Sequence, residues 1–207
     1  TNNNFANPIA MSNLGLLYVH KKKYQKATEL WQTALELRPN DNIIRYRYVI
    51  GLIEMKNWNA ALDNLGQLMS RHPHHFDYTY LKGYVLLNQN HYGAALKYFE
   101  QCLRLVSGNQ QALLGAGICN NLMGHYERAE AIFRRVLEFA PNDDLALLWL
   151  VETNMSVDDS QDADRYLKEL LAIVPSNELL VLLQEDSGKN FLPVVSKAKI
   201  IKRIKSL

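Results

Sequence analysis

The sequence predicts an all-α protein, an α-solenoid of stacked helix pairs with a further helix that caps its C-terminal end. Three kinds of residue recur every 34 positions without an insertion. The recurring sets are Ala27, Ala61, Ala95, Ala129 and Ala163; Tyr24, Trp58, Tyr92 and Tyr126; and Pro39, Pro73, Pro141 and Pro175. A fixed period of this length is typical of a repeat protein, and three sets in one phase predict five copies of one structural unit.

Each unit is expected to hold two helices joined by a turn. In the first unit, Ala27, Trp31 and Ala34 recur at i, i+4 and i+7, which is typical of the apolar stripe of a helix. The run Pro39-Asn40-Asp41 then ends that helix and offers an N-cap for the next one. The same order of signals returns in the later units.

Glycines at one phase of the repeat predict a close approach between helices. Gly15, Gly83 and Gly117 occupy the same position of their units. A glycine inside a helix costs about 1 kcal/mol relative to alanine, so its recurrence needs a packing reason. We expect each glycine to lie where its helix touches a neighbouring helix.

These positions resemble the pattern of the tetratricopeptide repeat, which places Leu-Gly, Tyr, Ala, an aromatic residue, Ala and Pro at fixed offsets. The unit 8–41 matches most fully, whereas Val49 and Val151 replace the glycine in two later units. The resemblance implies a right-handed α-solenoid of tetratricopeptide helix pairs. The predicted segments are a polar leader at 1–7, repeats at 8–41, 42–75, 76–109, 110–143 and 144–177, a capping helix at 178–186, and a basic tail at 187–207.

The basic tail differs in charge from the rest of the chain. Residues 187–207 hold six basic and no acidic side chains, while the preceding residues hold 17 basic and 21 acidic ones. Val194, Ala198, Ile201 and Ile204 predict the apolar stripe of a basic amphipathic helix within 192–207. Such a helix could lie on an anionic membrane, dock on a partner or pack back on the solenoid. We favour packing back, because a terminal helix docks where it buries apolar area.

The resemblance also implies which residues face a concave groove. In this family the first helix of each repeat lines the groove, and repeat positions 2, 5, 9 and 12 share that face. The candidate contact residues, including two asparagines that could bond a ligand backbone, are Leu16, Val19, Ile43, Tyr46, Ile50, Ile53, Tyr80, Tyr84, Leu87, Asn88, Ile118 and Asn121. Their apolar and aromatic character predicts a partner protein or peptide with an apolar or aromatic segment.

The same groove positions bear on other classes of ligand. Family members that hold the acidic C-termini of chaperones use groove Lys, Asn and Arg, and this groove has Tyr46, Tyr80, Leu114 and Leu148 instead. RNA-binding pentatricopeptide arrays have a period of 35, so the 34-residue spacing and the weakly acidic body predict no nucleic-acid partner. The stripe could also be covered by the chain's own termini or by a tightly closed superhelix.

No constellation of residues predicts catalysis. The histidines at 72–75 lie in a turn away from the other histidines, so solvated turn residues are a better interpretation than a metal site. The acidic run from Asp158 has the spacing of a calcium loop, but Ala163 stands where that loop needs glycine. Cys102 and Cys119 fall at positions that predict small buried side chains. The sequence therefore predicts no catalytic residues, no metal, no cofactor and no small-molecule substrate.

The function expected from the sequence is that of a non-catalytic interaction scaffold. Neither a signal peptide nor an apolar run of membrane-spanning length is visible, so a cytoplasmic location is favoured, with membrane contact only through 192–207. Two other classes stay open. One is a regulatory or substrate-tethering repeat domain of a larger enzyme or envelope-assembly protein, and the other is a membrane-associated assembly factor that uses the tail.

Overall fold

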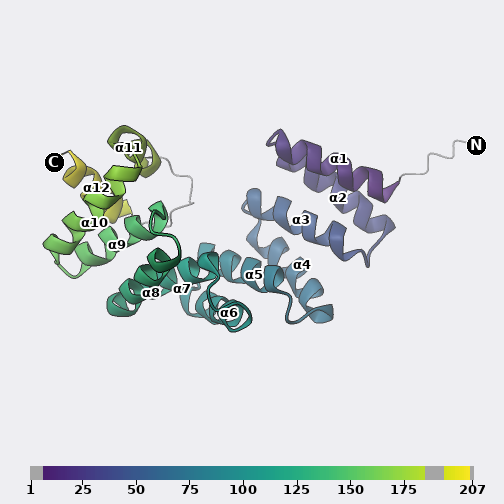
Figure 1. Cartoon of the computed structure of the whole chain (residues 1–207). Coiled ribbons are helices and arrows are strands. Elements are labelled where there is room, and N and C mark those ends of the chain that lie inside the picture. The colour runs from purple at the N-terminus through teal and green to yellow at the C-terminus, as the bar shows by residue number, and fades with distance from the viewer. Residues whose placement is uncertain (1–6, 185–193, 206–207) are drawn as a thin grey trace, which may run out of the picture. The chain divides into compact units, whose positions relative to one another are not determined.

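The computed structural model describes residues 7–184 and 194–205, and within these ranges it contains only helices and connecting turns. The helices, shown in Figure 1, are α1 (Pro8–His20), α2 (Tyr24–Leu37), α3 (Asn42–Glu54), α4 (Trp58–Arg71), α5 (Phe76–Asn88), α6 (Tyr92–Leu105), α7 (Gln110–Leu122), α8 (Tyr126–Phe139), α9 (Asp144–Ser156), α10 (Ser160–Ile173), α11 (Ser176–Gln184) and α12 (Val194–Ile204). Consecutive helix pairs confirm the predicted all-α repeat fold. Most of the predicted leader, the end of the predicted capping helix and parts of the predicted tail lie outside the described residues.

Polar residues at one phase of the repeat begin the first helix of a pair. Side-chain oxygens of Asn7, Asp41, Asn109 and Asp143 accept hydrogen bonds from backbone N–H groups in the first turns of α1, α3, α7 and α9. The two bonds to Asp41 measure 3.0 and 3.1 Å. Such caps satisfy N–H groups that have no partner within the helix and contribute about 1 kcal/mol each. These caps therefore fix the first residue of each of the four helices at the equivalent position of its repeat.

The turn between the two helices of each pair holds one residue in the left-handed region. The φ angle is 53° at Lys22, 56° at Lys56, 62° at Asn90, 80° at Gly124 and 60° at Asp158, again 34 residues apart. Glycine adopts this conformation freely, while other residues adopt it at a cost of about 1–2 kcal/mol. Four of the five turns therefore carry a small backbone strain.

Small residues lie where paired helices touch. The recurring alanines 27, 61, 95, 129 and 163 are all fully buried. A Cβ atom on Gly15 would lie 2.5 Å from Nε1 of Trp31, and a Cβ on Gly117 would lie 2.5 Å from Cε1 of Phe133. The predicted packing role of these two glycines is confirmed, and the group that needs the space is the aromatic ring of the second helix.

The chain divides into two compact units, Thr1–Val85 and Leu86–Leu207, and the boundary falls inside α5. In unit 1, α1 packs on α2, α2 on α3 and α3 on α4. One apolar cluster joins α1, α2 and α3 around Trp31, and a second joins α3, α4 and the N-terminal part of α5 around Leu65. Each cluster is thus shared between one helix pair and the first helix of the next.

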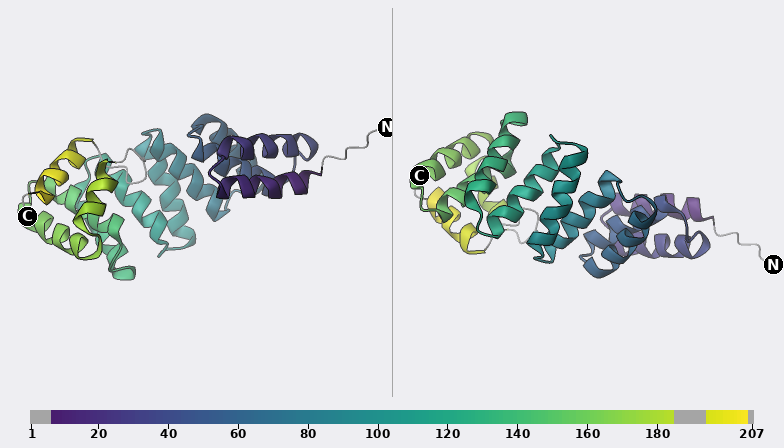
Figure 2. Two further views of the ribbon diagram at one scale, coloured as in Figure 1. Left: turned by 90° about the horizontal axis from the view of Figure 1, so that it is seen from above. Right: turned by 90° about the horizontal axis from the view of Figure 1, so that it is seen from below.

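Unit 2 continues with neighbouring helices from α6 to α10 packed on one another, followed by α11 and α12. The yellow helix α12 lies against α9, α10 and α11 (Figure 2). Its Ile200 and Ile204 are buried. The Ser196 hydroxyl donates to Glu152 of α9 at 3.1 Å, and Arg203 Nε donates to Asp164 of α10 at 2.5 Å. The expectation that this helix packs back on the solenoid is confirmed for residues 194–205.

The buried side of α12 differs from the predicted stripe. Ile200 is fully buried, Ala198 is exposed and Ile201 is half-buried, so the predicted centre of the stripe was wrong. The bond from Arg203 to α10 places the side of α12 that carries Ile200 and Ile204 against the fold. The spacing of apolar residues in the sequence does not reveal this ion pair between α12 and α10, so it could not predict the rotation of α12.

We expect Arg203→Ala to loosen α12. The hydrogen bond from Arg203 is the main cause that lowers the pKa of Asp164. A lowered carboxyl pKa stabilises the docked helix above the unfolded value of about 3.9, and that contribution is lost as the pH falls through the lower folded value. Loss of a partly exposed pair of this kind should speed cleavage after the lysines of α12 about threefold to fivefold at neutral pH.

Limited digestion with a lysine-specific protease measures this rate, because Arg203→Ala removes no cleavage site. Arg128→Ala, which changes an exposed arginine of α8, is the matched control and should cut at the wild-type rate. In the wild type, the protection of the α12 amides from exchange, relative to their intrinsic rates at each pH, should also fall below about pH 4. Equal cleavage of Arg203→Ala and the wild type would contradict the role given to this pair.

Candidate functional site

Unit 1 brings most of the predicted groove residues onto neighbouring first helices. Helix α1 packs against α3, and Tyr46 of α3 contacts Tyr78 of α5 with ring centroids 5.7 Å apart. Ile43 is 66% exposed, whereas Ile53 is buried. We call the exposed and partly exposed set the α1–α3–α5 face; its members are Leu16, Val19, Ile43, Tyr46, Ile50, Tyr80 and Tyr84.

Aromatic rings dominate the α3–α5 part of this face. Phe76 and Tyr80 stack one turn apart on α5, with centroids 6.4 Å apart and planes 3° from parallel. Burial raises the pKa of the Tyr46 hydroxyl, and Asp77 and Tyr78 add to the rise. A phenol with a raised pKa stays protonated at neutral pH, so Tyr46 offers a hydroxyl donor beside its apolar ring.

A cation lies beside this face, and sequence reasoning missed it. Arg47 of α3 donates from Nη1 to the hydroxyl oxygen of Ser12 at 2.7 Å and to Oδ1 of Asn13 at 3.1 Å, both on α1. These bonds tie α3 to α1. Ser12 was the available signal in the sequence, because it is a polar residue at a groove position whose neighbours Leu16 and Val19 are apolar. A buried polar side chain needs a hydrogen-bond partner, and Arg47 supplies it.

In unit 2 the predicted residues lie mostly inside the fold. Leu87 and Ile118 are each 2% exposed and Asn121 is 3% exposed, while Asn88 in the last turn of α5 is partly exposed. The Asn121 amide donates to the Thr153 hydroxyl of α9 at 2.8 Å. Side chains buried this deeply present no surface to a partner in this conformation. The accessible part of the predicted set is therefore concentrated in unit 1.

Glu152 shows how one such position is closed in unit 2. Its Oε1 accepts hydrogen bonds from Ser156 at 3.0 Å and from Ser196 of α12 at 3.1 Å, and the side chain is buried. Its Oε2 has no hydrogen-bond partner within the described part of the chain. Glu152 holds the same repeat position as Ile50 and Tyr84 of the α1–α3–α5 face. At this position, the chain's own helix α12 packs over the side chain.

The other candidate residues serve the fold. Cys102 and Cys119 are buried, and burial raises the pKa of the Cys119 thiol to about 12, so this thiol stays protonated at neutral pH. His72 bonds the Asn42 side chain at 2.9 Å, and His75 stacks on Tyr78 with centroids 4.0 Å apart. Across residues 7–184 and 194–205, no group of three metal-ligating side chains is placed to hold an ion. Over the same ranges, no helix has the length and apolar character needed to cross a membrane.

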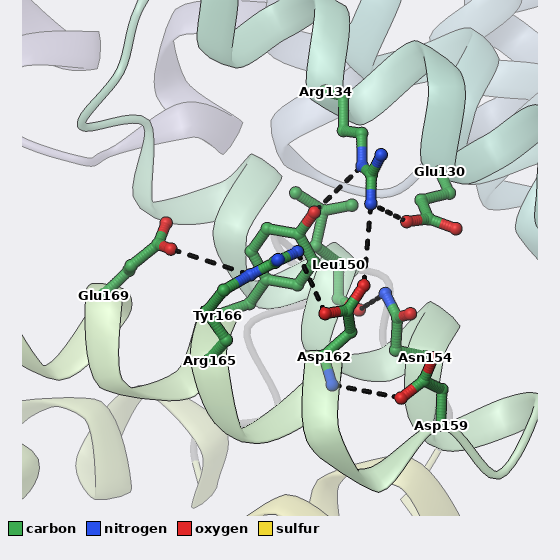
Figure 3. A network of polar contacts seen from close by, with 9 residues as sticks. All are labelled: Glu130, Arg134, Leu150, Asn154, Asp159, Asp162, Arg165, Tyr166 and Glu169. Atoms are coloured by element: carbon green, nitrogen blue, oxygen red, sulfur yellow. Dashed lines mark hydrogen bonds and ion pairs between the residues drawn. The ribbon is translucent and has the colours of Figure 1, made fainter.

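A polar network joins the second helices α8 and α10 (Figure 3). Arg134 of α8 donates to the Tyr166 hydroxyl at 2.9 Å and pairs with Glu130 at 2.7 Å and Asp162 at 3.6 Å. Arg165 pairs with the same Asp162 at 3.1 Å. Asp162 belongs to the acidic run with calcium-loop spacing, and here it lies in the first turn of α10 with arginine partners. The network links two repeats and has the composition of a solvated helix surface.

Comparison with known proteins places this geometry among repeat proteins. Two sequence models of the tetratricopeptide repeat match the chain, one over residues 8–41 and the other over residues 86–149. The TPR repeat-containing protein MJ1428 of Methanocaldococcus jannaschii is 28% identical over 138 residues, which are 66% of this chain and 24% of that protein. The chain thus spans about a quarter of the length of that relative.

Solved structures share the fold at low sequence identity. A tetratricopeptide repeat protein from Parabacteroides merdae superposes with a TM-score of 0.77 at 22% identity, covering 99% of this chain and 80% of that one. PilW, described as a type IV pilus biogenesis factor, superposes with a TM-score of 0.75 at 21% identity, covering 96% of this chain and 90% of its own. At such identities the likeness concerns the fold alone.

Proposed function

Because the chain belongs to the tetratricopeptide repeat family, we propose that it is an interaction scaffold that binds an apolar or aromatic segment of a partner protein on its α1–α3–α5 face. Repeats of this family are in general non-catalytic modules that bind proteins or peptides. The observation that carries the proposal is the set of accessible apolar and aromatic side chains on three first helices of unit 1, whereas Ile118 and Glu152, at the repeat position of Ile50 and Tyr84, are buried in unit 2.

The chemistry of the face selects the ligand. Ile43 and Ile50 lie two turns apart on α3 and offer aliphatic contact, and Tyr80 and Tyr84 lie one turn apart on α5 and offer rigid ring surface. Removal of apolar side chains from water against such surface is the dominant favourable contribution to association. The nearby cation, Arg47, is already bonded to Ser12 and Asn13. The face therefore favours apolar and aromatic anchors over an acidic terminus.

The test is a selection of short random peptides displayed on phage against the wild-type chain, followed by affinity measurement on the enriched peptides. We expect these peptides to be rich in large apolar and aromatic residues. Tyr80→Ala/Tyr84→Ala should weaken their binding at least about tenfold, because central aromatic anchors dominate interface energetics. Fluorescence anisotropy measures the affinities, and circular dichroism must show that the double variant keeps its helicity.

Phe139→Ala is the control, since it removes an exposed aromatic side chain from α8 in unit 2 that is not a member of the α1–α3–α5 face. It should bind the selected peptides as the wild type does. Equal affinity of the wild type and the Tyr80/Tyr84 double variant would refute the proposed face. Failure to enrich any peptide, or enrichment of acidic peptides, would refute the proposed ligand class.

A further inference from the structure

The repeat at 42–75 departs from the other repeats at three positions. Where it carries Arg45, Asn64 and Arg71, the other repeats carry uncharged and mostly apolar residues. These are Met11, Thr79, Leu113 and Leu147 for Arg45; Leu30, Tyr98, Ile132 and Tyr166 for Asn64; and Leu37, Leu105, Phe139 and Ile173 for Arg71. Residues that break the pattern of their own fold are expected at functional or strained sites.

These three side chains converge on the turn between α2 and α3 (Figure 1). Arg45 of α3 donates from Nη1 to Oδ1 of Asn64 at 2.8 Å and from Nη2 to the backbone oxygen of Pro39 at 2.5 Å. Arg71, the last residue of α4, donates from Nη1 to the next backbone oxygen, that of Asn40, at 3.1 Å. Two guanidinium groups from different helices thus bind consecutive carbonyl groups of one turn.

The turn and the second arginine are held in place by further hydrogen bonds. The Asp41 N–H donates to the Arg38 carbonyl at 3.1 Å and closes the turn. Arg71 also donates to Oδ1 of Asn40 at 2.5 Å and to Oδ1 of Asn42 at 3.3 Å. A ligand that binds a side chain already fixed in this way pays little of the entropy cost of ordering it.

The positive charge of this arginine pair has no counter-ion in the described part of the chain. Both arginines donate only to neutral oxygens there, and neither makes an ion pair. The acidic residue of the turn, Asp41, uses Oδ1 to accept from backbone N–H groups at the start of α3. Arg134, Arg165 and Arg203, by contrast, each pair with a carboxylate.

Burial makes the missing counter-ion significant. Arg45 is only 9% exposed. Burial lowers the pKa of its guanidinium, and the positive charge of Arg71 lowers it further, so the two charges lie close enough to repel each other. A buried cation is stable where hydrogen bonds and an opposite charge compensate its loss of water. Here the hydrogen bonds are present, and the described chain does not supply the opposite charge.

Both arginines keep donors for an anion. A guanidinium carries five N–H groups in a planar fork. The bonds described above come from the Nη atoms, and within the described chain neither Nε donates a hydrogen bond. Arg71 lies on the surface at the end of α4, so a solute can reach the pair from that side.

We propose that Arg45 and Arg71, at the turn between α2 and α3, bind the phosphate group of a small solute. Phosphate groups carry a charge of about −1.5 to −2 at neutral pH, which matches the two positive charges of the pair. Their oxygens accept from the guanidinium fork in a bidentate manner. A carboxylate has one negative charge and would neutralise only one of the two arginines. Neither arginine belongs to the α1–α3–α5 face.

Titration of the ¹⁵N-labelled chain with inorganic phosphate, followed by NMR at constant ionic strength, tests the site. The backbone amide signals of residues 38–42 and the Nε–H signal of Arg71 should shift, with a dissociation constant of about 0.1–1 mM for a small, partly exposed site. A second arm uses glycerol phosphate. Tighter binding of glycerol phosphate would identify a phosphate ester as the ligand, and tighter binding of inorganic phosphate would identify the free ion.

Arg71→Leu tests the arginine pair, because it installs the residue that Leu37 and Leu105 hold at the same repeat position and should therefore fold. It should weaken phosphate binding at least about tenfold, since it removes one of the two charges and its donors. Arg104→Leu is the matched control, because it makes the same substitution at an exposed arginine in the last turn of α6. It should bind phosphate as the wild type does.

Three results would overturn the proposal. Unchanged signals of residues 38–42 up to about 20 mM phosphate, far above the expected dissociation constant, would leave the arginines with a structural role only. Equal affinity of Arg71→Leu and the wild type, or shifts centred on the lysines at 21–23, would place phosphate binding elsewhere. Acetate binding as tightly as phosphate would assign the site to carboxylates. Peptide binding to the α1–α3–α5 face is measured separately, so this proposal and the proposed function fail independently.

Discussion

Replacing Phe133 with alanine is expected to lower the free energy of unfolding by about 3–5 kcal/mol. The ring is fully buried in α8 and stacks on Trp149 of α9, with centroids 6.0 Å apart. It also fills the space left by Gly117 of α7. One side chain therefore joins three helices of two successive repeats, and its removal leaves a cavity between packed helices that cannot close freely. Equilibrium urea unfolding followed by circular dichroism gives the change, with the slope checked against that of the wild type.

Phe139→Ala is the matched control for this effect. It makes the same substitution six residues later in α8, at a ring that is 58% exposed. Its expected cost is below about 1 kcal/mol, because little apolar surface leaves the interior. Similar losses from the two variants would contradict the view that Phe133 is the shared packing element of these repeats.

Gly117→Ala and Gly66→Ala should change stability in opposite directions. Alanine at 117 puts a Cβ 2.5 Å from the ring of Phe133, which is held by its neighbours, so we expect a loss of about 1–3 kcal/mol. Alanine at 66 meets no atom within 4 Å on the exposed side of α4, so the helix propensity of alanine should stabilise the chain by about 1 kcal/mol. The same urea titration measures both variants.

The two glycines control for each other, because the chemical change is identical. Stabilisation by Gly117→Ala would show that the ring of Phe133 yields and that the glycine is not required for packing. Destabilisation by Gly66→Ala would show that this position makes a contact that the folded chain does not reveal.

The interior of the fold was predictable because it depends on residues that recur. Ala27, Trp31, Phe99 and Phe133 are buried where the period and helical spacing place them. Two caps expected from the Pro-Asn-Asp runs, Asp41 and Asp143, are also observed. Each of these features involves only a helix and its sequence neighbours, so a local pattern contains the information needed.

Depth of burial and helix rotation were less predictable. The face of a first helix follows from the 3.6-residue period, but its exposure depends on what packs across it, so Tyr80 stays accessible while Ile118 is buried. The rotation of α12 depends on an arginine pairing with α10, a contact distant in sequence. The left-handed turns had only a partial compositional signal, because Gly124, Asn90 and Asp158 are types that tolerate that conformation whereas Lys22 and Lys56 are not. The contact residues on the α1–α3–α5 face stay a prediction until the peptide test is made.

The pairing of helices with their sequence neighbours, described above for each unit, has a consequence for folding kinetics. Each such contact closes a short stretch of chain, so little loop entropy opposes it, and proteins with mainly local contacts fold fast. A helix pair can pack as soon as the ribosome releases it, without waiting for distant residues. During synthesis the most recently packed helix pair then exposes one apolar face until the next pair packs on it. The face left by α9 and α10 is closed only when α11 and α12 emerge.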